Sequence, residues 1–332
     1  YSYFCQTFMK EQVFNIQSKA EFTQIALRIF EHQFKNNKVY RSFCDLLYIH
    51  PSDVKTIEQI PFLPIQFFKT REVLSSTNKI QEIFTSSGTT GSVTSKHLVT
   101  DLSWYEESYL KGFKHFYGNI EEYVVLALLP NYLERKGSSL IYMVDDLIQK
   151  SKNPESGFFL KNEAELAKKL QFLDKKGQKT LLIGVSFALL DLIEKHQFNL
   201  KNTVVMETGG MKGRRKELVR KELHKLLSDG FGVDKIHSEY GMTELLSQGY
   251  SNGNGIFNCP PWMKILTRDT EDALTINKPG KSGGINVIDL ANFNSCSFIA
   301  TQDLGKVHQN GSFEIIGRFD NSDIRGCNLM VL

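Results

Sequence analysis

Apolar residues recur at helical spacing between residues 18 and 50. They stand three or four positions apart, which places them on one face of a helix. The residues in this pattern are Phe22, Ile25, Ala26, Ile29, Phe30 and Phe34. Pro51, Pro61 and Pro64 follow, and because proline interrupts helices, they predict an extended, packed connection.

Short apolar runs alternate with helical patterns further along the chain. Helices are expected over residues 103–117, 163–175, 186–196 and 215–227. Strands are expected at 83–84, 124–129, 180–185 and 203–206. Strands that alternate with helices are typical of a largely parallel sheet covered by helices, so the pattern predicts an α/β fold.

The helical patterns fade after Cys259. Short apolar runs there are separated by turn sequences such as Lys278-Pro279-Gly280 and Asn310-Gly311, which predict a β-rich portion. No long linker divides it from the rest.

Composition narrows the class of protein. The 332 residues are 41% apolar and 23% charged, as in a soluble globular protein, and the formal net charge of +3 gives no reason to expect a nucleic-acid partner. The longest mostly apolar run, residues 181–193, is too short to span a bilayer. The first residues lack the basic start and apolar core of a secretion signal, so we expect a cytoplasmic protein.

The five cysteines are spaced too widely for a CxxC metal site and are odd in number, so reduced thiols are expected. One of them, Cys327, belongs to a motif described below. We interpret the other four as structural: Cys5, Cys44, Cys259 and Cys296.

A loop rich in glycine and hydroxyl groups follows the strand expected at Ile83. Its backbone N–H groups and hydroxyls can surround phosphate oxygens, although no Gly-Lys-Ser/Thr follows as in a Walker loop. An ordinary hydroxyl-rich turn is the alternative. The residues are Thr85, Ser86, Ser87, Gly88, Thr89, Thr90 and Gly91.

A second motif runs from Ser238 to Glu244 and reads SEYGMTE. Tyr240 offers a flat face for adenine, Thr243 offers a hydroxyl to a phosphate, and Glu244 offers oxygen ligands to Mg²⁺. A strand end with a solvated glutamate is the alternative.

Two further motifs lie in the β-rich portion. In Thr301-Gln302-Asp303-Leu304-Gly305 we expect the Asp303 carboxylate to be held in a tight turn, where it accepts hydrogen bonds from two ribose hydroxyls. An aspartate that only caps a turn is the alternative. In Gly317-Arg318-Phe319-Asp320, Arg318 is suited to ribose or phosphate, or to a surface ion pair.

In this order, the four motifs resemble those of the acyl-adenylate-forming enzymes, a superfamily that includes acyl-CoA ligases, luciferases and peptide-synthetase adenylation domains. The resemblance covers roughly residues 80 to 325 and implies attack of a carboxylate on the α-phosphorus of ATP, with Mg²⁺. It implies that residues 85–91 hold phosphates and that Gly209 and Gly210 border the adenine pocket beside Tyr240, Gly241 and Met242. Thr243 and Glu244 then serve the α-phosphate and the metal, while Asp303 and Arg318 hold ribose.

The resemblance also implies a fold: layered α/β subdomains with a β-rich portion, without the usual small C-terminal domain. We expect an adenylate-forming domain over residues 1–320 and a hinge with a short tail over 321–332. That missing domain supplies a lysine to the reaction in most relatives. Three alternatives remain: another cation of this chain substitutes, a partner supplies one, or the reaction is slow. Candidate substitutes are Lys96, Lys212, Arg214 and Arg215.

The ending Arg325-Gly326-Cys327 and the N-terminal stretch IPFLPIQFFK, residues 60–69, resemble the acyl-protein synthetase (LuxE-like) family. Such enzymes transfer the acyl group from AMP to a cysteine near the C-terminus and then to a reductase partner, and Cys327 matches that position. Arg325 would favour its thiolate, whereas a buried, inert thiol is the alternative.

We therefore expect an ATP-dependent acid–thiol ligase that activates a carboxylic, fatty acid and passes the acyl group through Cys327 to an acyl reductase or other acceptor protein. A CoA ligase of the phenylacetate type, with coenzyme A as acceptor, is the first alternative. A non-catalytic nucleotide- or acyl-binding subunit is the second. The run of cations from Lys212 to Lys225 is interpreted as a solvated helix face, because Glu217 and Glu222 are interleaved with it.

Overall fold

A computed structural model describes residues 3–86, 93–129, 137–159, 162–209 and 218–319. Its helices are α1 (Tyr3–Phe14), α2 (Lys19–Asn36), α3 (Lys38–Leu46), α4 (Phe67–Thr70), α5 (Leu102–Tyr117), α6 (Ser139–Lys150), α7 (Glu163–Lys175), α8 (Ser186–Lys195) and α9 (Arg220–Phe231), with 3₁₀ turns η1 (Pro51–Asp53), η2 (Ile57–Gln59), η3 (Ile120–Glu122) and η4 (Leu290–Asn292). Its strands are β1 (Leu63–Pro64), β2 (Glu82–Thr85), β3 (Lys96–Val99), β4 (Val124–Leu128), β5 (Gly157–Phe158), β6 (Thr180–Val185), β7 (Thr203–Thr208), β8 (His237–Tyr240), β9 (Gly249–Ser251), β10 (Phe257–Asn258), β11 (Met263–Arg268), β12 (Ser282–Asp289), β13 (Phe298–Val307) and β14 (Phe313–Arg318).

The helical pattern between residues 18 and 50 forms two helices, α2 and α3. Ser18 caps α2 because its side chain accepts a hydrogen bond from the backbone N–H of Glu21, and Asn37 caps α3 in the same way. The apolar face of α2 is buried, as its spacing predicts. The proline-rich connection that follows is packed, as expected, but only partly extended. It contains the 3₁₀ turns η1 and η2, and its end forms β1, which pairs in parallel with β13.

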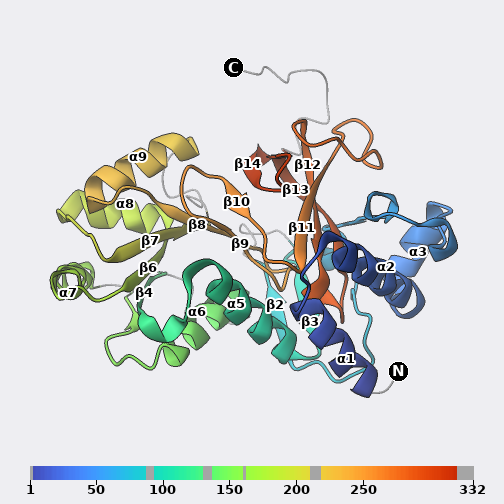
Figure 1. Ribbon diagram of the computed structural model, residues 1–332, viewed down its shortest axis with the longest axis horizontal. Helices are drawn as coiled ribbons and strands as arrows, with labels where there is room; N and C mark the ends of the chain where they lie inside the picture. Colours follow the sequence, from blue (N-terminus) through green and yellow to red (C-terminus); the bar gives the residue numbers. More distant parts are fainter. Residues whose placement is uncertain (1–2, 87–92, 130–136, 160–161, 210–217, 320–332) are drawn as a thin grey trace.

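The middle of the chain forms the parallel part of the sheet. Strands β5, β4, β6, β7 and β8 lie side by side in parallel. Figure 1 shows α8 and α9 on one side of these strands and α5 and α6 on the other. Both faces are thus covered, which explains why β4 and β6 consist almost entirely of buried apolar residues. The predicted α/β architecture is confirmed.

The sheet changes direction after β8. Strand β9 pairs antiparallel with β8, and β10, β14, β13, β12 and β11 follow in spatial order. The pairs among β11, β12, β13 and β14 are antiparallel, so the β-rich portion expected after Cys259 is confirmed. In Figure 1 these strands stand between the parallel strands and helices α2 and α3, and these two helices lie at the opposite end of the molecule from α7.

Some elements differ from the sequence-based expectation. The basic helix was expected from residue 215, but α9 begins at Arg220, and Val219 before it is extended and 74% exposed. The helix packs through its buried residues Leu223, Leu227 and Phe231. Residues 215–217 of the expected helix lie outside the described residues. Helices α1 and α6 were not predicted, although Ser138 caps α6 and its apolar positions have helical spacing.

None of the helices within the described ranges is both long and apolar enough to cross a bilayer. The expected boundary at residue 320 coincides with the end of the described residues, so the division into domain and tail stays a prediction.

Candidate active site

The candidate site lies where the parallel strands end and the sheet changes direction. Gly209 follows β7, and Tyr240 is the last residue of β8, which is flanked by parallel β7 and antiparallel β9. The carboxyl ends of strands at such a change of direction form the usual ligand crevice of open α/β sheets. The Gly209 position and the motif of residues 238–244 are therefore brought to the same edge of the sheet.

Tyr240 and Asp303 are joined by a hydrogen bond, and Arg318 adds an ion pair. The hydroxyl of Tyr240 donates to Oδ2 of Asp303 at 2.8 Å, and Nε of Arg318 lies 3.2 Å from Oδ1. Asp303 and Arg318 are direct partners in the β13–β14 ladder. Burial raises the pKa of Asp303, while Tyr240, Arg318 and Arg268 oppose the rise. Three motifs distant in sequence therefore meet at one carboxylate.

Asp303 does not lie in a tight turn, so that expectation is wrong. It lies inside β13, between β12 and β14. A bulge between Leu304 and Gly305 interrupts the pairing with β14 just after it, and this explains why the local sequence looks like a turn. The Tyr240 ring is only 9% exposed and packs edge-on against Phe257 and Phe313. Adenine stacking on Tyr240 stays a prediction.

Thr243 and Glu244 follow β8 in a turn, where the N–H of Leu245 donates to the carbonyl of Met242 at 3.1 Å. Glu244 is 5% exposed, so it is not a solvated glutamate. Burial raises its pKa, while a hydrogen bond from Ser95 and the charges of Arg318 and Lys69 oppose the rise. The sequence pattern did not single out Lys69, although it belongs to the stretch 60–69.

Glu244 fits a magnesium ion that is held mainly by a nucleotide. Mg²⁺ in phosphate-transfer sites is commonly bound by one or two carboxylates together with substrate phosphates and water. Among the residues that the structure describes, no group of three or more His, Cys, Asp or Glu side chains could hold a metal without such help. The buried carboxyl of Glu244 would therefore be the protein ligand, and the ion would offset phosphate charge.

The first two residues of the predicted phosphate loop, Thr85 and Ser86, lie at the end of the β2–β3 hairpin. Thr85 pairs with Lys96, and the N–H of Ser95 donates to Oγ of Ser86 at 2.9 Å. Lys96 is exposed and belongs to the last residue pair of the β2–β3 ladder before the predicted loop. The rest of the predicted loop and several other predicted residues lie outside the described residues: Ser87, Gly88, Thr89, Thr90, Gly91, Gly210, Lys212, Arg214, Arg215 and Cys327.

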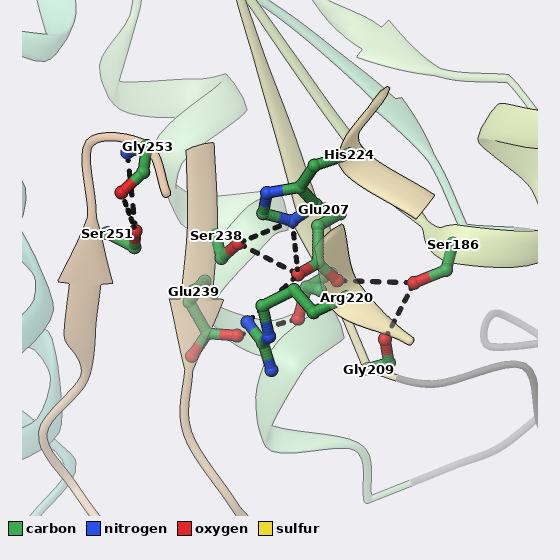
Figure 2. Close-up of polar contacts among 10 residues, drawn as sticks. Ser186, Glu207, Gly209, Arg220, His224, Ser238, Glu239, Ser251 and Gly253 are labelled. Carbon is green, nitrogen blue, oxygen red and sulfur yellow. Dashed lines mark hydrogen bonds and ion pairs between the residues drawn. The ribbon is translucent and has the colours of Figure 1, made fainter. Parts of the chain in front are cut away.

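A buried carboxylate organises the ends of β7 and β8, as Figure 2 shows. Glu207 is 5% exposed and accepts a hydrogen bond from the hydroxyl of Ser238 at 2.8 Å. Arg220 and His224 of α9 lie 3.3 and 3.4 Å from the same oxygen. These partners outweigh burial and lower the pKa of Glu207. The hydroxyl of Ser186 lies 3.2 Å from Glu207 and 3.0 Å from the carbonyl of Gly209, which fixes Gly209 at the edge.

The pKa of Glu239 is shifted in the opposite direction from that of Glu207. Thr208 donates to its Oε2 at 2.6 Å, but burial and the charge of Glu207 raise its pKa to about 7. A Cβ added at Gly241 would lie 2.3 Å from Oε1 of Glu239, so a larger residue at this position would have to displace the Glu239 carboxyl group. This close approach gives a structural reason for the glycine in the motif.

The described cysteines that were expected to be structural are poor nucleophiles. Cys44 and Cys296 are buried free thiols, and burial raises the pKa of Cys44 to about 12. The pKa values of Cys259 and Cys296 are raised for the same reason. Any thiol chemistry would have to come from elsewhere in the chain.

The fold is shared with enzymes that form acyl-adenylates. A 2-hydroxyisobutyryl-CoA ligase, solved with 2-HIB-AMP and CoA, aligns over 92% of this chain and 72% of its own, with a TM-score of 0.69 and 13% identity. ATP-bound MatB from Rhodopseudomonas palustris aligns over 73% of this chain with a TM-score of 0.55 and 17% identity. The aligned part is about half (49%) of the MatB chain.

Similarity in sequence is more specific. The long-chain-fatty-acid–luciferin-component ligase of Aliivibrio fischeri is 25% identical over 96% of this chain and 90% of its own length. The ligase of the same description from Vibrio harveyi is 21% identical over 96% and 89%. Residues 11–122 and 156–332 match the family described as acyl-protein synthetase, LuxE. The chain belongs to the acyl-protein synthetase (LuxE) family.

Proposed function

We propose that this acyl-protein synthetase activates a long-chain fatty acid with ATP and Mg²⁺ and then carries the acyl group on Cys327. In the first step a carboxylate oxygen attacks the α-phosphorus of ATP, the bond to the β-phosphate oxygen breaks, and pyrophosphate leaves with the released electron pair. The fatty-acid specificity is inferred from the two relatives, which are both long-chain-fatty-acid ligases. The ligase activity itself is that of the family.

The single observation that carries this proposal is the meeting of Tyr240, Asp303 and Arg318 beside the Thr243–Glu244 turn. Asp303 offers a carboxylate to ribose hydroxyls. The Arg318 side chain is 75% exposed and pairs with Asp303 through Nε, so its terminal guanidinium N–H groups would be offered to a phosphate. Thr243 and Glu244 would then face the α-phosphate and its metal ion. Gly209, with Gly210, would border the base.

Cations must offset the charge that develops on the phosphates. Lys69 and Arg318 are the lysine and arginine whose charges bear on the pKa of Glu244, and Lys96 stands at the mouth of the β2–β3 hairpin. We assign to Lys69, Arg318 and Lys96 the role of offsetting this charge in the adenylation step.

The second step transfers the acyl group to sulfur. The thiolate of Cys327 attacks the carbonyl carbon of the acyl-adenylate, the bond between that carbon and the phosphate oxygen breaks, and AMP leaves with the electron pair. The product is a thioester, which a partner protein that accepts or reduces acyl groups would consume. The high pKa values of Cys44, Cys259 and Cys296 leave them unsuited to this step.

Covalent labelling tests the assignment of Cys327. The full chain is incubated with ATP, Mg²⁺ and radiolabelled palmitate, denatured, and treated with neutral hydroxylamine, which cleaves thioesters. Label is expected on the wild type and on Cys296→Ser, and not on Cys327→Ser, which still exchanges pyrophosphate into ATP. Persistent hydroxylamine-sensitive label on Cys327→Ser would refute the assignment, and strict dependence of product formation on coenzyme A would favour the CoA-ligase alternative.

A further inference from the structure

The turn that carries Thr243 and Glu244 is held from outside by buried side chains. His97 of β3, Asp289 at the end of β12 and Asn292 of η4 contact the backbone of residues 243–247. We call these three residues the anchor cluster. Their exposed fractions are 1% or less, so water cannot replace their contacts.

Asn292 lies at the centre of the anchor cluster. Its Nδ2 donates to the carbonyl of Glu244 at 2.8 Å, and its Oδ1 lies 3.0 Å from Nε2 of His97. Its backbone carbonyl accepts a hydrogen bond from Gln33 of α2 at 3.1 Å. The amide is therefore held by α2 and β3, while it fixes the backbone orientation of the predicted metal ligand.

His97 fixes the preceding residue. Its Nδ1 lies 2.9 Å from the carbonyl of Thr243, and the ring packs edge-on against Phe68 of α4 at 5.8 Å. Burial lowers the pKa of His97 to about 4, so the ring is neutral at pH 7. Nδ1 and Nε2 face two acceptors, the carbonyl of Thr243 and Oδ1 of Asn292. A neutral ring has one N–H, so it donates to Thr243 only in the tautomer that carries the hydrogen on Nδ1.

Asp289 fixes the far end of the turn. Its Oδ2 accepts hydrogen bonds from the N–H groups of Leu246 and Ser247 at 2.7 and 3.0 Å. The backbone is thus anchored at residues 243, 244, 246 and 247. Thr243 and Glu244 lie in the part held by His97 and Asn292, and Asp289 serves residues that follow the motif.

We propose that His97 and Asn292 are positioning residues for adenylation, because they aim the side chains of Thr243 and Glu244 through the carbonyl groups of those residues. This inference rests on the proposed function. Neither residue belongs to the predicted ribose contacts, Asp303 and Arg318, or to the predicted adenine contact, Tyr240. Loss of either anchor is therefore expected to misplace groups that act in the transition state, while binding of ATP in the ground state is kept.

Steady-state kinetics on the full chain test this role. Acid-dependent ATP–pyrophosphate exchange is measured with palmitate for the wild type, Asn292→Ala and His97→Ala. We expect kcat to fall by roughly tenfold to a hundredfold, since small misplacements of catalytic groups have effects of this size, and KM for ATP to change by no more than about twofold.

Asn37→Ala is the matched control. Asn37 is also a fully buried amide, and its Nδ2 donates to the carbonyl of Ser295 at 3.0 Å. Its loss is expected to lower the thermal unfolding temperature about as much as the loss of Asn292, without the fall in kcat per folded molecule. Thermal unfolding and gel filtration on every variant give the folded fraction.

Two conservative variants keep the test decisive if the alanine variants fold poorly. The amide of His97→Asn places a donor near the position of Nδ1, whereas that of His97→Gln places one near Nε2. Restored contact with Thr243 predicts a higher kcat for His97→Asn than for His97→Gln at equal folded fraction. The reverse order would overturn the proposal.

The failure of this inference differs from that of the proposed function. A wild-type chain without acid-dependent exchange would refute the function. An active wild type whose Asn292→Ala variant loses no more kcat than Asn37→Ala, or loses kcat and ATP affinity together, would refute the positioning role alone.

Discussion

The hydroxyl of Tyr240 donates a hydrogen bond to Oδ2 of Asp303 at 2.8 Å, and this contact joins β8 to β13 across three intervening strands. With Arg318 on Oδ1, both carboxylate oxygens of Asp303 are oriented before a nucleotide arrives. Preorganisation of this kind reduces the free energy that a ligand must spend on ordering the site.

Tyr240→Phe is therefore expected to weaken ATP binding more than it slows the chemical step. Loss of one hydrogen bond to a carboxylate costs about 1–2 kcal/mol, so KM for ATP should rise by roughly five- to thirtyfold while kcat changes little. Tyr109→Phe is the control, because Tyr109 is a buried tyrosine whose hydroxyl donates to Asp146 at 2.7 Å. Equal effects of the two substitutions on KM would contradict a special role for Tyr240.

Glu244→Gln should separate activity from stability. Because burial disfavours the charged form of Glu244, the neutral amide should leave the thermal unfolding temperature unchanged or higher. Acid-dependent pyrophosphate exchange should nevertheless fall by about a hundredfold or more, since a preorganised electrostatic contact to the metal is lost. Glu106→Gln serves as the control. Unchanged exchange in Glu244→Gln would exclude it as the metal ligand.

The parallel part of the fold could be predicted because its signals are local. The expected strand at 180–185 and helix at 163–175 match β6 and α7. Their patterns of apolar residues can be recognised within about a dozen consecutive residues. Asp303 shows the limit: its sequence looks like a turn, yet pairing with β12 and β14, which come from separate segments, makes it part of a strand.

The residues that hold the candidate site could not be predicted in the same way. His97 and Asn292 are single polar residues without a motif around them, and they meet the turn at residues 243–244 only through tertiary packing. Glu207 likewise looks like one polar residue at a strand end, and its partners Ser186, Arg220 and Ser238 come from three other elements.

Stability should depend on pH through Glu239. Its pKa is raised from 4.5 to about 7, so the folded protein binds more protons than the unfolded chain between these values, and the stability contribution of this group is lost as the pH rises through that range. Glu239→Gln should be more stable than the wild type by up to about 3 kcal/mol at pH 8 and no more stable below about pH 4.

Denaturant unfolding at both pH values measures the effect of Glu239→Gln. Glu121→Gln is the control, because the pKa of Glu121 is lowered by its hydrogen bond and ion pair with Lys152. A difference between Glu239→Gln and the wild type that is equally large at both pH values would contradict this account of Glu239.

Lys69 and Lys96 should each support the adenylation step. Removal of a cation that stabilises phosphate charge predicts a fall in the exchange rate of roughly tenfold or more for Lys69→Ala and for Lys96→Ala. Lys79→Ala, another exposed lysine between them in sequence, should have no effect. If neither variant differs from Lys79→Ala, the compensating charge comes from another part of the chain.

The most direct test of the central claim is ATP–pyrophosphate exchange by the purified full chain with Mg²⁺ and fatty acids of increasing length, without coenzyme A. The account predicts that labelled pyrophosphate enters ATP only when an acid is present, that longer chains support faster exchange, and that Asp303→Ala abolishes it. Exchange that needs no acid, or ATP binding seen by calorimetry without any exchange, would contradict it.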